Sequence, residues 1–192
     1  MKRLLSLFLA LAASASLASA QTSTWVPDKA HSGVDFSILH MSLSKVHGHF
    51  GNIGGNITLN ESDITKSTVN VTIDTTTIDT GVTQRDADLK SDHFFDVAQF
   101  PTATFVSTSV TGSGKKLTVS GNLTLHGVTK PVVLEVEGPN GPVPGMDKKQ
   151  HLGFSVTTKL NRKDFGIGTK YPPAVVGDDV SLTIDLDAVK QQ

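Results

Sequence analysis

Apolar and polar residues alternate with a period of two along most of the chain after residue 20. In one such segment, Val34, Phe36 and Ile38 alternate with Asp35 and Ser37. The same alternation recurs in the segments 57–59, 69–73, 117–125, 134–136, 152–160 and 180–186. Strict alternation predicts half-buried β-strands with one apolar and one polar face, which is typical of antiparallel sheets rather than parallel ones.

One short segment departs from this pattern. Thr83 is followed three residues later by Asp86, which resembles a capping box and predicts a short helix that reaches Lys90. Three phenylalanines follow between positions 94 and 100. Because large rings bury a great deal of apolar surface, we expect them to hold the helix against the sheet or inside it.

Glycine and proline mark the connections between the predicted strands. They cluster in the segments 51–55, 112–114, 138–145 and 171–173. The first two clusters predict turns, the third a long exposed loop and the fourth an irregular stretch.

Eight or nine strands with one helical connection predict an all-β domain. The pattern alone leaves a sandwich and a barrel open. A barrel is attractive because closure removes exposed strand edges. Strands of about ten residues tilted near 40° predict a barrel roughly 25 Å tall. The interior of an eight-stranded barrel is either filled by its own side chains or holds one small ligand.

The first twenty residues predict a secretory signal peptide rather than part of the fold. Lys2 and Arg3 form a positive head, an apolar stretch runs from residue 4 to residue 17, and Ala18-Ser19-Ala20 suits a cleavage site. We therefore expect residues 21–192 to form the mature domain and to act in the periplasm. Removal of the leader takes the formal charge from −1 to −3.

Composition excludes several classes of protein. The charge balance argues against a nucleic-acid partner, which would favour a basic surplus. Beyond the leader no apolar run is long enough to span a membrane, so we expect no stable membrane insertion. The absence of cysteine excludes disulfides, thiolate metal sites and thiol nucleophiles.

No catalytic motif stands out, so we expect a protein that is not an enzyme and has no cofactor. The sequence has no G-x-S-x-G elbow, no H-E-x-x-H pair and no glycine-rich phosphate loop before a helix. His47 and His49 would lie on one face of a strand, within reach of one metal ion. No third ligand is evident nearby, so two surface histidines beside a turn are the favoured interpretation and no metal site is predicted.

Five other polar residues require an interpretation. His31 and His40 flank the strand 34–38 and suit buried hydrogen-bonding roles, with contact to a ligand as the alternative. His126 lies at a predicted hairpin, where an orienting role is favoured over that of a base. Arg162 and Lys163 suit a solvated turn, with a basic rim for an anionic headgroup as the alternative.

A series of motifs resembles the YceI-like family in order along essentially the whole mature chain. The most specific stretch runs from Arg85-Asp86 to Phe94-Phe95-Asp96-Val97. The remaining motifs lie in the segments 25–40, 48–50, 100–105, 121–131, 162–166 and 176–180.

This resemblance implies an extended, antiparallel, eight-stranded lipocalin-like barrel with an apolar tunnel. Members of the family bind polyisoprenoid chains or similar long amphiphiles in the bacterial periplasm, and some are dimers. The expected function is therefore a periplasmic carrier of an isoprenoid-type lipid, and a possible homodimer stays open. The alternative is a stress-response or interaction protein whose barrel core is filled.

The apolar faces and the ring cluster supply the candidate ligand-binding residues. Phe94, Phe95 and the short helix are expected to shape one mouth or wall, with the polar end of the lipid near a polar rim. The apolar candidates are Phe36, Ile38, Phe50, Val71, Phe94, Phe95, Phe105, Leu123, Leu125 and Phe154, and the rim candidates are His31, His40 and Arg162.

Overall fold

The computed structural model describes residues 21–191, so the predicted signal peptide lies outside the described residues. The described chain is built almost wholly of strands, with one α-helix, α1 (Thr83–Lys90), among these residues. The strands are β1 (Thr22–Pro27), β2 (Gly33–His40), β3 (Ser44–Phe50), β4 (Ile53–Asn60), β5 (Thr68–Asp74), β6 (Thr102–Ser113), β7 (Lys116–Leu125), β8 (Val128–Pro144), β9 (Gln150–Asn161) and β10 (Val176–Lys190). Three short 3-10 helices complete the fold: η1 (Ile64–Lys66), η2 (Thr75–Thr77) and η3 (Arg162–Phe165).

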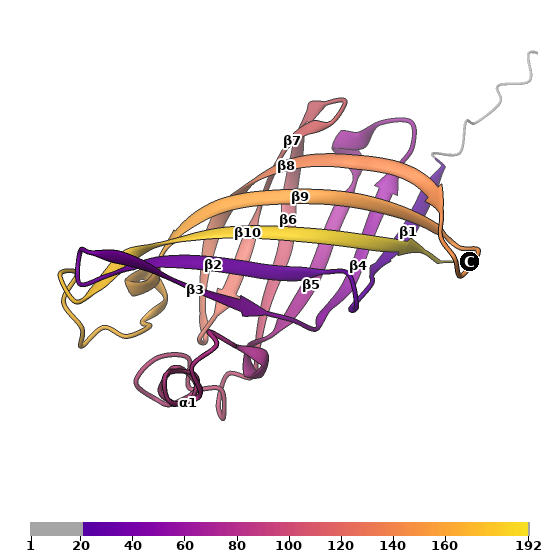
Figure 1. Cartoon of the computed structure of the whole chain (residues 1–192). Coiled ribbons are helices and arrows are strands. Elements are labelled where there is room, and N and C mark those ends of the chain that lie inside the picture. The colour runs from indigo at the N-terminus through magenta and orange to yellow at the C-terminus, as the bar shows by residue number, and fades with distance from the viewer. Residues whose placement is uncertain (1–20, 192) are drawn as a thin grey trace, which may run out of the picture.

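Eight of the strands close into an antiparallel barrel, which confirms the predicted fold (Figure 1). The order around the ring is β1, β4, β5, β6, β7, β8, β9 and β10, and β10 pairs with β1 to complete it. The hairpin of β2 and β3 continues the wall along the other half of β10, since β2 pairs with the segment 176–185. Alternation along each strand sends the apolar face inward, where the core lies.

The barrel is more elongated than the predicted 25 Å. Strand β8 has 17 residues and β10 has 15 residues, rather than about ten. At roughly 3.3 Å per residue and the same tilt near 40°, β10 spans roughly 38 Å along the barrel axis. The segment 138–145 explains part of this difference. Instead of a long exposed loop, it continues β8 and pairs irregularly with β9, at Asn140 with Gly153 and at Val143 with His151.

The glycine-rich segment 51–55 is not a turn, which corrects a second expectation. Strands β1 and β2 are both antiparallel to β10, so their partners β4 and β3 run in one direction. The chain therefore passes from β3 to β4 through a two-residue break. Gly54 and Gly55 lie inside β4, and a Cβ on Gly55 would come within 2.2 Å of the Asn70 carbonyl oxygen.

The two ends of the barrel differ. At one end, which we call the capped end, Ile64 of η1 packs against the cluster formed by Trp25, Ile57, Leu59, Leu152, Phe154 and Ala188. At the other end, which we call the mouth end, the wall between β3 and β6 is completed by residues 75–101. His49 and Asp79 exchange backbone hydrogen bonds of 2.8 and 3.0 Å along the outer edge of β3. Figure 1 shows α1 lying beneath the barrel on this side.

The helix is present as predicted, but its cap is different. Val82 occupies the N-cap position and no side chain caps the helix there. The Asp86 carboxylate instead accepts hydrogen bonds from the backbone N–H and the hydroxyl of Thr80. The capping box was therefore wrong, because this carboxylate ties the helix to the preceding loop rather than to its own first turn.

Candidate functional site: a two-chamber apolar cavity

The barrel interior is hollow. A chamber of about 350 Å³, which we call the mouth chamber, lies between β2, β3, α1 and the η3 region. A second chamber of about 140 Å³, the inner chamber, lies deeper among β4 to β10. The two chambers adjoin, because five residues line both: Val34, Ile73, Leu123, Leu160 and Leu182. A core filled by its own side chains is therefore not what this sequence forms.

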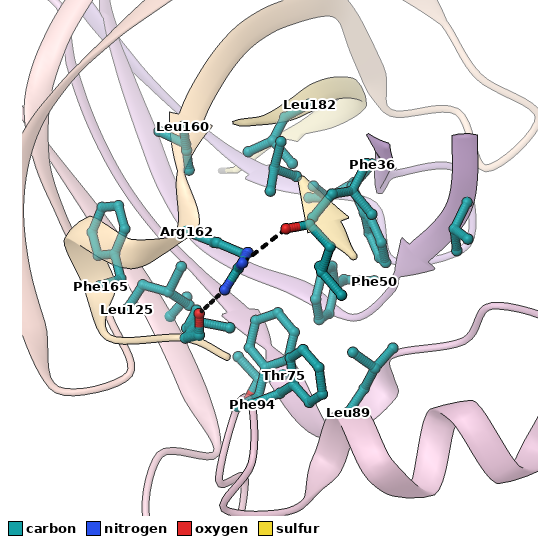
Figure 2. Close-up of a pocket in the computed structure, with 18 of the residues that line it drawn as sticks. Phe36, Phe50, Thr75, Leu89, Phe94, Leu125, Leu160, Arg162, Phe165 and Leu182 are labelled. Atoms are coloured by element: carbon teal, nitrogen blue, oxygen red, sulfur yellow. Dashed lines mark hydrogen bonds between the residues drawn. The ribbon is translucent and has the colours of Figure 1, made fainter. Parts of the chain in front are cut away.

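The mouth chamber is walled chiefly by aromatic and aliphatic side chains (Figure 2). The Phe36 and Phe50 rings lie on one side, with ring centroids 5.5 Å apart, and Phe165 lies on the opposite side. Leu89 reaches in from α1. The chamber extends to the surface beside the β2–β3 hairpin, because Leu39 lines it and is itself exposed.

Most of the predicted ligand-binding residues line these chambers. The mouth chamber includes Phe36, Ile38, His40, Phe50, Phe94, Phe95, Leu123, Leu125 and Arg162. The inner chamber includes Val71, Phe105, Leu123 and Phe154. The structure thus brings together twelve of the thirteen candidates, and His31 lies apart from both chambers.

Close approach of backbone lets two of these rings lie flat against the wall. Phe36 is the cross-strand partner of Gly48, and a Cβ on that glycine would come within 2.3 Å of the Phe36 ring. Gly121 lies on the strand beside Phe105, two residues from its direct partner Leu123, and a Cβ there would come within 2.4 Å of the Phe105 ring. A missing side chain in the neighbouring strand therefore provides the space that each ring occupies.

Arg162 is a structural residue rather than part of a solvated turn. Its side chain is 4% exposed, although it begins η3 at the wall of the mouth chamber. Its five N–H groups donate to the Asp178 carboxylate and to carbonyl oxygens of residues 167, 168, 171, 176 and 177. Burial lowers the pKa of Arg162, and Asp178 opposes that shift. Because the guanidinium is fully paired, it holds the η3 loop together and offers no free donor to a headgroup.

The histidines also differ from expectation. His31 and His40 are both exposed rather than buried. His49 pairs with Asp35 at 3.1 Å, and His47 is exposed, so the favoured interpretation of two surface histidines agrees with their positions. His126 forms the β7–β8 turn and its Nδ1 lies 3.0 Å from the Phe165 carbonyl oxygen. That contact supports the predicted orienting role.

Sequence reasoning missed several lining residues. Tyr171 stacks on Phe94 with ring centroids 5.0 Å apart, and Arg85 and Asp88 line the chamber from α1. Arg85 donates from Nε and Nη2 to Thr80, and among residues 21–191 its Nη1 has no partner. Tyr171 is the single tyrosine of the chain and follows a lysine just before two prolines, but nothing local shows that it faces Phe94.

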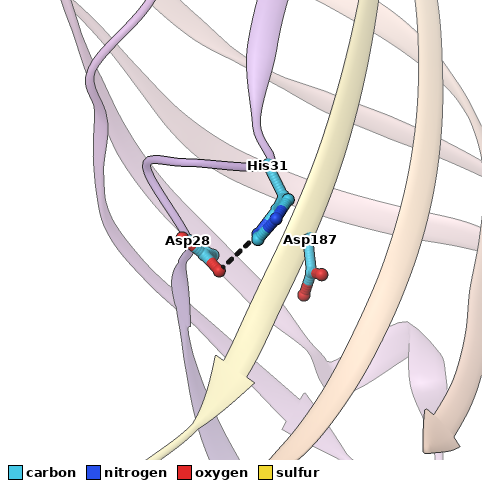
Figure 3. Close-up of side chains that lie close together, drawn as sticks. All are labelled: Asp28, His31 and Asp187. Atoms are coloured by element: carbon cyan, nitrogen blue, oxygen red, sulfur yellow. Dashed lines mark hydrogen bonds and ion pairs between the residues drawn. The ribbon is translucent and has the colours of Figure 1, made fainter. Parts of the chain in front are cut away.

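His31 belongs to a polar cluster at the break between β1 and β2 (Figure 3). Its Nδ1 lies 2.8 Å from Asp28, which raises the pKa of His31 and lowers that of Asp28. His151 lies 2.8 Å from Asp187 and 3.2 Å from Asp147, and both carboxylates raise its pKa. His151 thereby joins the loop before β9 to the end of β10, and the loop after β1 is joined there by the Asp28 N–H and the Ser32 hydroxyl, which donate to the Asp187 carbonyl oxygen.

The same cluster has a donor set that could suit a divalent cation. Ligand atoms of Asp28, His31 and Asp187 lie within 4.8 Å of one another. The Asp28 oxygens already accept from the Ala30 N–H and His31, and Asp187 accepts from His151. The cluster is therefore linked by hydrogen bonds of its own, which stabilise the strand break.

Comparison with known proteins identifies the lineage. The sequence model of the YceI-like domain matches residues 25–188. The chain belongs to the YceI-like family. Protein YceI of Salmonella newport (strain SL254) is 42% identical over 163 residues, which cover 84% of this chain and 83% of that protein.

Solved structures agree with this YceI-like assignment. The Campylobacter jejuni YceI protein is 30% identical, with a TM-score of 0.71 over 80% of this chain and 90% of that one. BcnA of Burkholderia cenocepacia shares the fold at 24% identity, with a TM-score of 0.75 over 84% and 98% of the two chains. A polyisoprenoid binding domain from Saccharophagus degradans, at 15% identity, has a TM-score of 0.65 over 89% and 100%.

Proposed function

We propose that this YceI-like barrel binds one long, flexible, apolar chain of the isoprenoid type and carries it through the periplasm. The observation that supports this function is the pair of adjoining chambers, which are lined chiefly by apolar side chains and reach the surface at one end. The fold neighbour from Saccharophagus degradans, described as a polyisoprenoid binding domain, points to the same ligand class. The predicted signal peptide supports action outside the cytoplasm, and no helix among residues 21–191 is long and apolar enough to span a membrane.

The energetics suit such a ligand. Burial of each methylene contributes about 0.8 kcal/mol, so some 20 carbons give roughly 16 kcal/mol before costs. Ordering the chain and losing its free motion offset several kcal/mol or more of that gain. The remainder corresponds to about micromolar to nanomolar dissociation constants. Because one methylene changes discrimination by only about 1–3 kcal/mol, we expect the barrel to accept several related lipids.

We place the polar end of the lipid at the mouth. Arg85 and Asp88 of α1 line the mouth chamber there, and the exposed His40 lies on the hairpin side. Nη1 of Arg85 could pair with a hydroxyl or phosphate oxygen at no cost to an existing hydrogen bond. The deep inner chamber, lined by aliphatic and aromatic side chains, would take the far end of the chain.

Lipid extraction tests this function directly. Protein purified from its own host without detergent should yield an isoprenoid-type lipid near one equivalent when extracted with organic solvent and analysed by mass spectrometry. Native mass spectrometry should show the same mass increment on the intact protein. Protein that carries no lipid and takes up no added prenyl alcohol or prenyl quinone would contradict the proposal.

A further inference from the structure

Four large apolar residues lie exposed together at the mouth end. Leu39 lies near the end of β2, Met41 and Leu43 lie in the β2–β3 turn, and Val175 lies in the loop before β10. Leu43 is 82% exposed and Met41 is 54% exposed. The Met41 N–H donates to the Val175 carbonyl oxygen at 2.9 Å, so the hairpin and the loop form one continuous surface. We call this surface the mouth patch.

The turn that presents the patch has an unusual sequence for its geometry. Met41 and Ser42 have φ values of 51° and 58°, and the Leu43 N–H donates to the His40 carbonyl oxygen at 3.0 Å. The connection has three residues, because His40 pairs with Ser44, and two successive left-handed residues at the centre of a hairpin turn are the arrangement that Asn-Gly favours. A methionine there adds backbone strain and also exposes an apolar side chain. Neither feature helps a hairpin that only faces water, so the strained turn points to a surface that contacts something apolar.

The two chain segments that carry the mouth patch, 36–48 and 166–177, have a positive charge. Lys45 follows it on β3 and Lys170 lies in the loop after η3. The segments 36–48 and 166–177 contain no carboxylate. Within the part of the chain that the structure describes, neither lysine forms an ion pair, whereas Lys159 and Lys163 are held by Asp179 and Asp178.

We infer that the mouth patch docks this protein onto the surface of an anionic lipid bilayer. The inference rests on the proposed function, because Leu39 and Val175 of the patch also line the mouth chamber. Docking would therefore set the opening of the cavity against the source of its lipid. Apolar side chains would enter the interface while Lys45 and Lys170 meet anionic headgroups.

The charge favours a membrane over a second copy of this chain. In a two-fold dimer through the mouth patch, the same surface of each copy faces its partner. Such a contact would bring the unpaired lysines of both copies into one interface, with no carboxylate from either mouth segment to balance them. An anionic bilayer supplies the opposite charge.

Vesicle sedimentation tests the docking surface. The wild-type protein should sediment with vesicles of phosphatidylcholine containing 30% phosphatidylglycerol, and less with phosphatidylcholine alone. Leu43→Asp should lower the partition coefficient tenfold or more. The matched control is Met146→Asp, which places the same charge on an exposed methionine in the β8–β9 connection at the capped end and should bind as the wild type does. Lys45→Gln and Lys170→Gln should each lower binding to the anionic vesicles about fivefold.

Two further measurements separate docking from lipid binding. Uptake of a fluorescent prenyl alcohol from vesicle-free solution should be the same for the wild type and Leu43→Asp. Prenyl uptake without vesicle binding, or equal vesicle binding by Leu43→Asp and the wild type, would overturn the docking surface and leave the proposed function standing. Light scattering that shows a dimer, which Leu43→Asp dissociates while vesicles go unbound, would assign the patch to a second copy and also overturn it.

Discussion

Phe94 is the side chain on which the mouth chamber and the η3 loop both depend. Its ring is 8% exposed and lies nearly parallel to Tyr171, at 14°. Gly168 allows this packing, since a Cβ there would come within 2.7 Å of the ring. One aromatic contact therefore joins the segment after α1 to the loop after η3, across the opening of the cavity.

We expect Phe94→Asp to abolish uptake of a prenyl lipid, because a carboxylate in the apolar wall is costly to desolvate beside a hydrocarbon chain. The strand signal in circular dichroism should persist, because Phe94 lies outside the barrel strands. Fluorescence titration with a labelled prenyl alcohol measures the uptake. Phe94→Leu, which keeps the wall apolar, should retain most of it. Full uptake by Phe94→Asp would mean that the lipid does not use the mouth chamber.

His151 links protein stability to pH at the residue scale. Its pKa is raised by Asp187 first and Asp147 second, so the folded state binds its proton more tightly than the unfolded state does. The resulting contribution to stability is complete below the unfolded pKa near 6.5 and is lost as pH rises through the folded pKa. His31 contributes with the same sign.

His151→Gln should therefore lose less stability than the wild type between pH 6 and pH 8.5. The expected difference is about 1 kcal/mol or less, as is usual for partly exposed ion pairs. Urea unfolding at the two pH values measures it. His47→Gln, at an exposed histidine without an ion pair among the described residues, should follow the wild type. Equal pH dependence in His151→Gln and the wild type would show that this pair carries no linkage.

At the scale of elements, residues 75–101 replace a missing stretch of barrel wall. Asp86 and Arg85 of α1 both bind Thr80, and the Thr75 N–H donates to the Pro101 carbonyl oxygen at 2.9 Å. These hydrogen bonds, rather than a strand ladder, hold α1 over the mouth chamber. Segments with few ladder hydrogen bonds open more readily than barrel strands do.

Asp86→Ala should accelerate release of a bound lipid severalfold, because the Thr80 N–H and hydroxyl would lose their acceptor. The free energy of unfolding should fall by about 1–3 kcal/mol. Stopped-flow displacement of a fluorescent prenyl lipid measures the release, and hydrogen exchange across residues 75–101 should increase with it. Gln84→Ala, on the exposed side of the same helix, should leave both rates unchanged. Faster exchange without faster release would mean that α1 does not gate the cavity.

The sequence was informative about elements wherever local pattern decides them. Each alternating segment became a strand, and the two central residues of the β7–β8 turn are His126 and Gly127, as expected for a hairpin. The segments 51–55 and 138–145 were misassigned. Glycine and proline predict a turn only when no other strand forms backbone pairs with the segment that contains them. Here β5 and β9 supply that pairing. The capping pattern was wrong for a similar reason, because the Asp86 carboxylate binds Thr80 in the preceding loop, and the pattern considers only residues within the helix.

At the scale of the whole molecule, the continuity of the two chambers sets the length of chain that the barrel can hold. Leu123 lines both chambers and is the cross-strand partner of Phe105. A larger side chain there would narrow the passage between the mouth chamber and the inner chamber.

Leu123→Trp should weaken binding of a long prenyl chain tenfold or more and leave binding of a chain of two or three isoprene units nearly unchanged. Stability should change little, because the added ring enters existing space rather than a packed core. Titration with prenyl alcohols of increasing length measures the effect. Leu182→Met, a substitution of similar volume at another residue shared by the chambers, is the control. An equal loss for short and long chains would show that the chambers are used separately.

Several features of this protein follow from the sequence alone, because they depend on neighbours along the chain. Alternation with a period of two gives antiparallel strands with one apolar face, and the family motifs assign the barrel and its phenylalanine-rich segment. The same local information also marks Phe36, Phe50 and Phe94 as inward-facing rings.

Other features were decided only when distant segments met. Whether the barrel is filled or hollow depends on how much of the interior volume the side chains of facing strands occupy. The alternation of apolar and polar residues does not predict that volume. The sequence around Arg162 indicated a surface residue, but in the folded protein backbone carbonyl groups from residues 167 to 177 surround its guanidinium group. His31 and His40 flank the same strand, but only His40 lines the cavity. His31 instead lies at the break between β1 and β2, where β10 places Asp187 beside it. The burial of a side chain and its hydrogen-bond partners depend on segments that are distant in the sequence, so only the tertiary structure determines them.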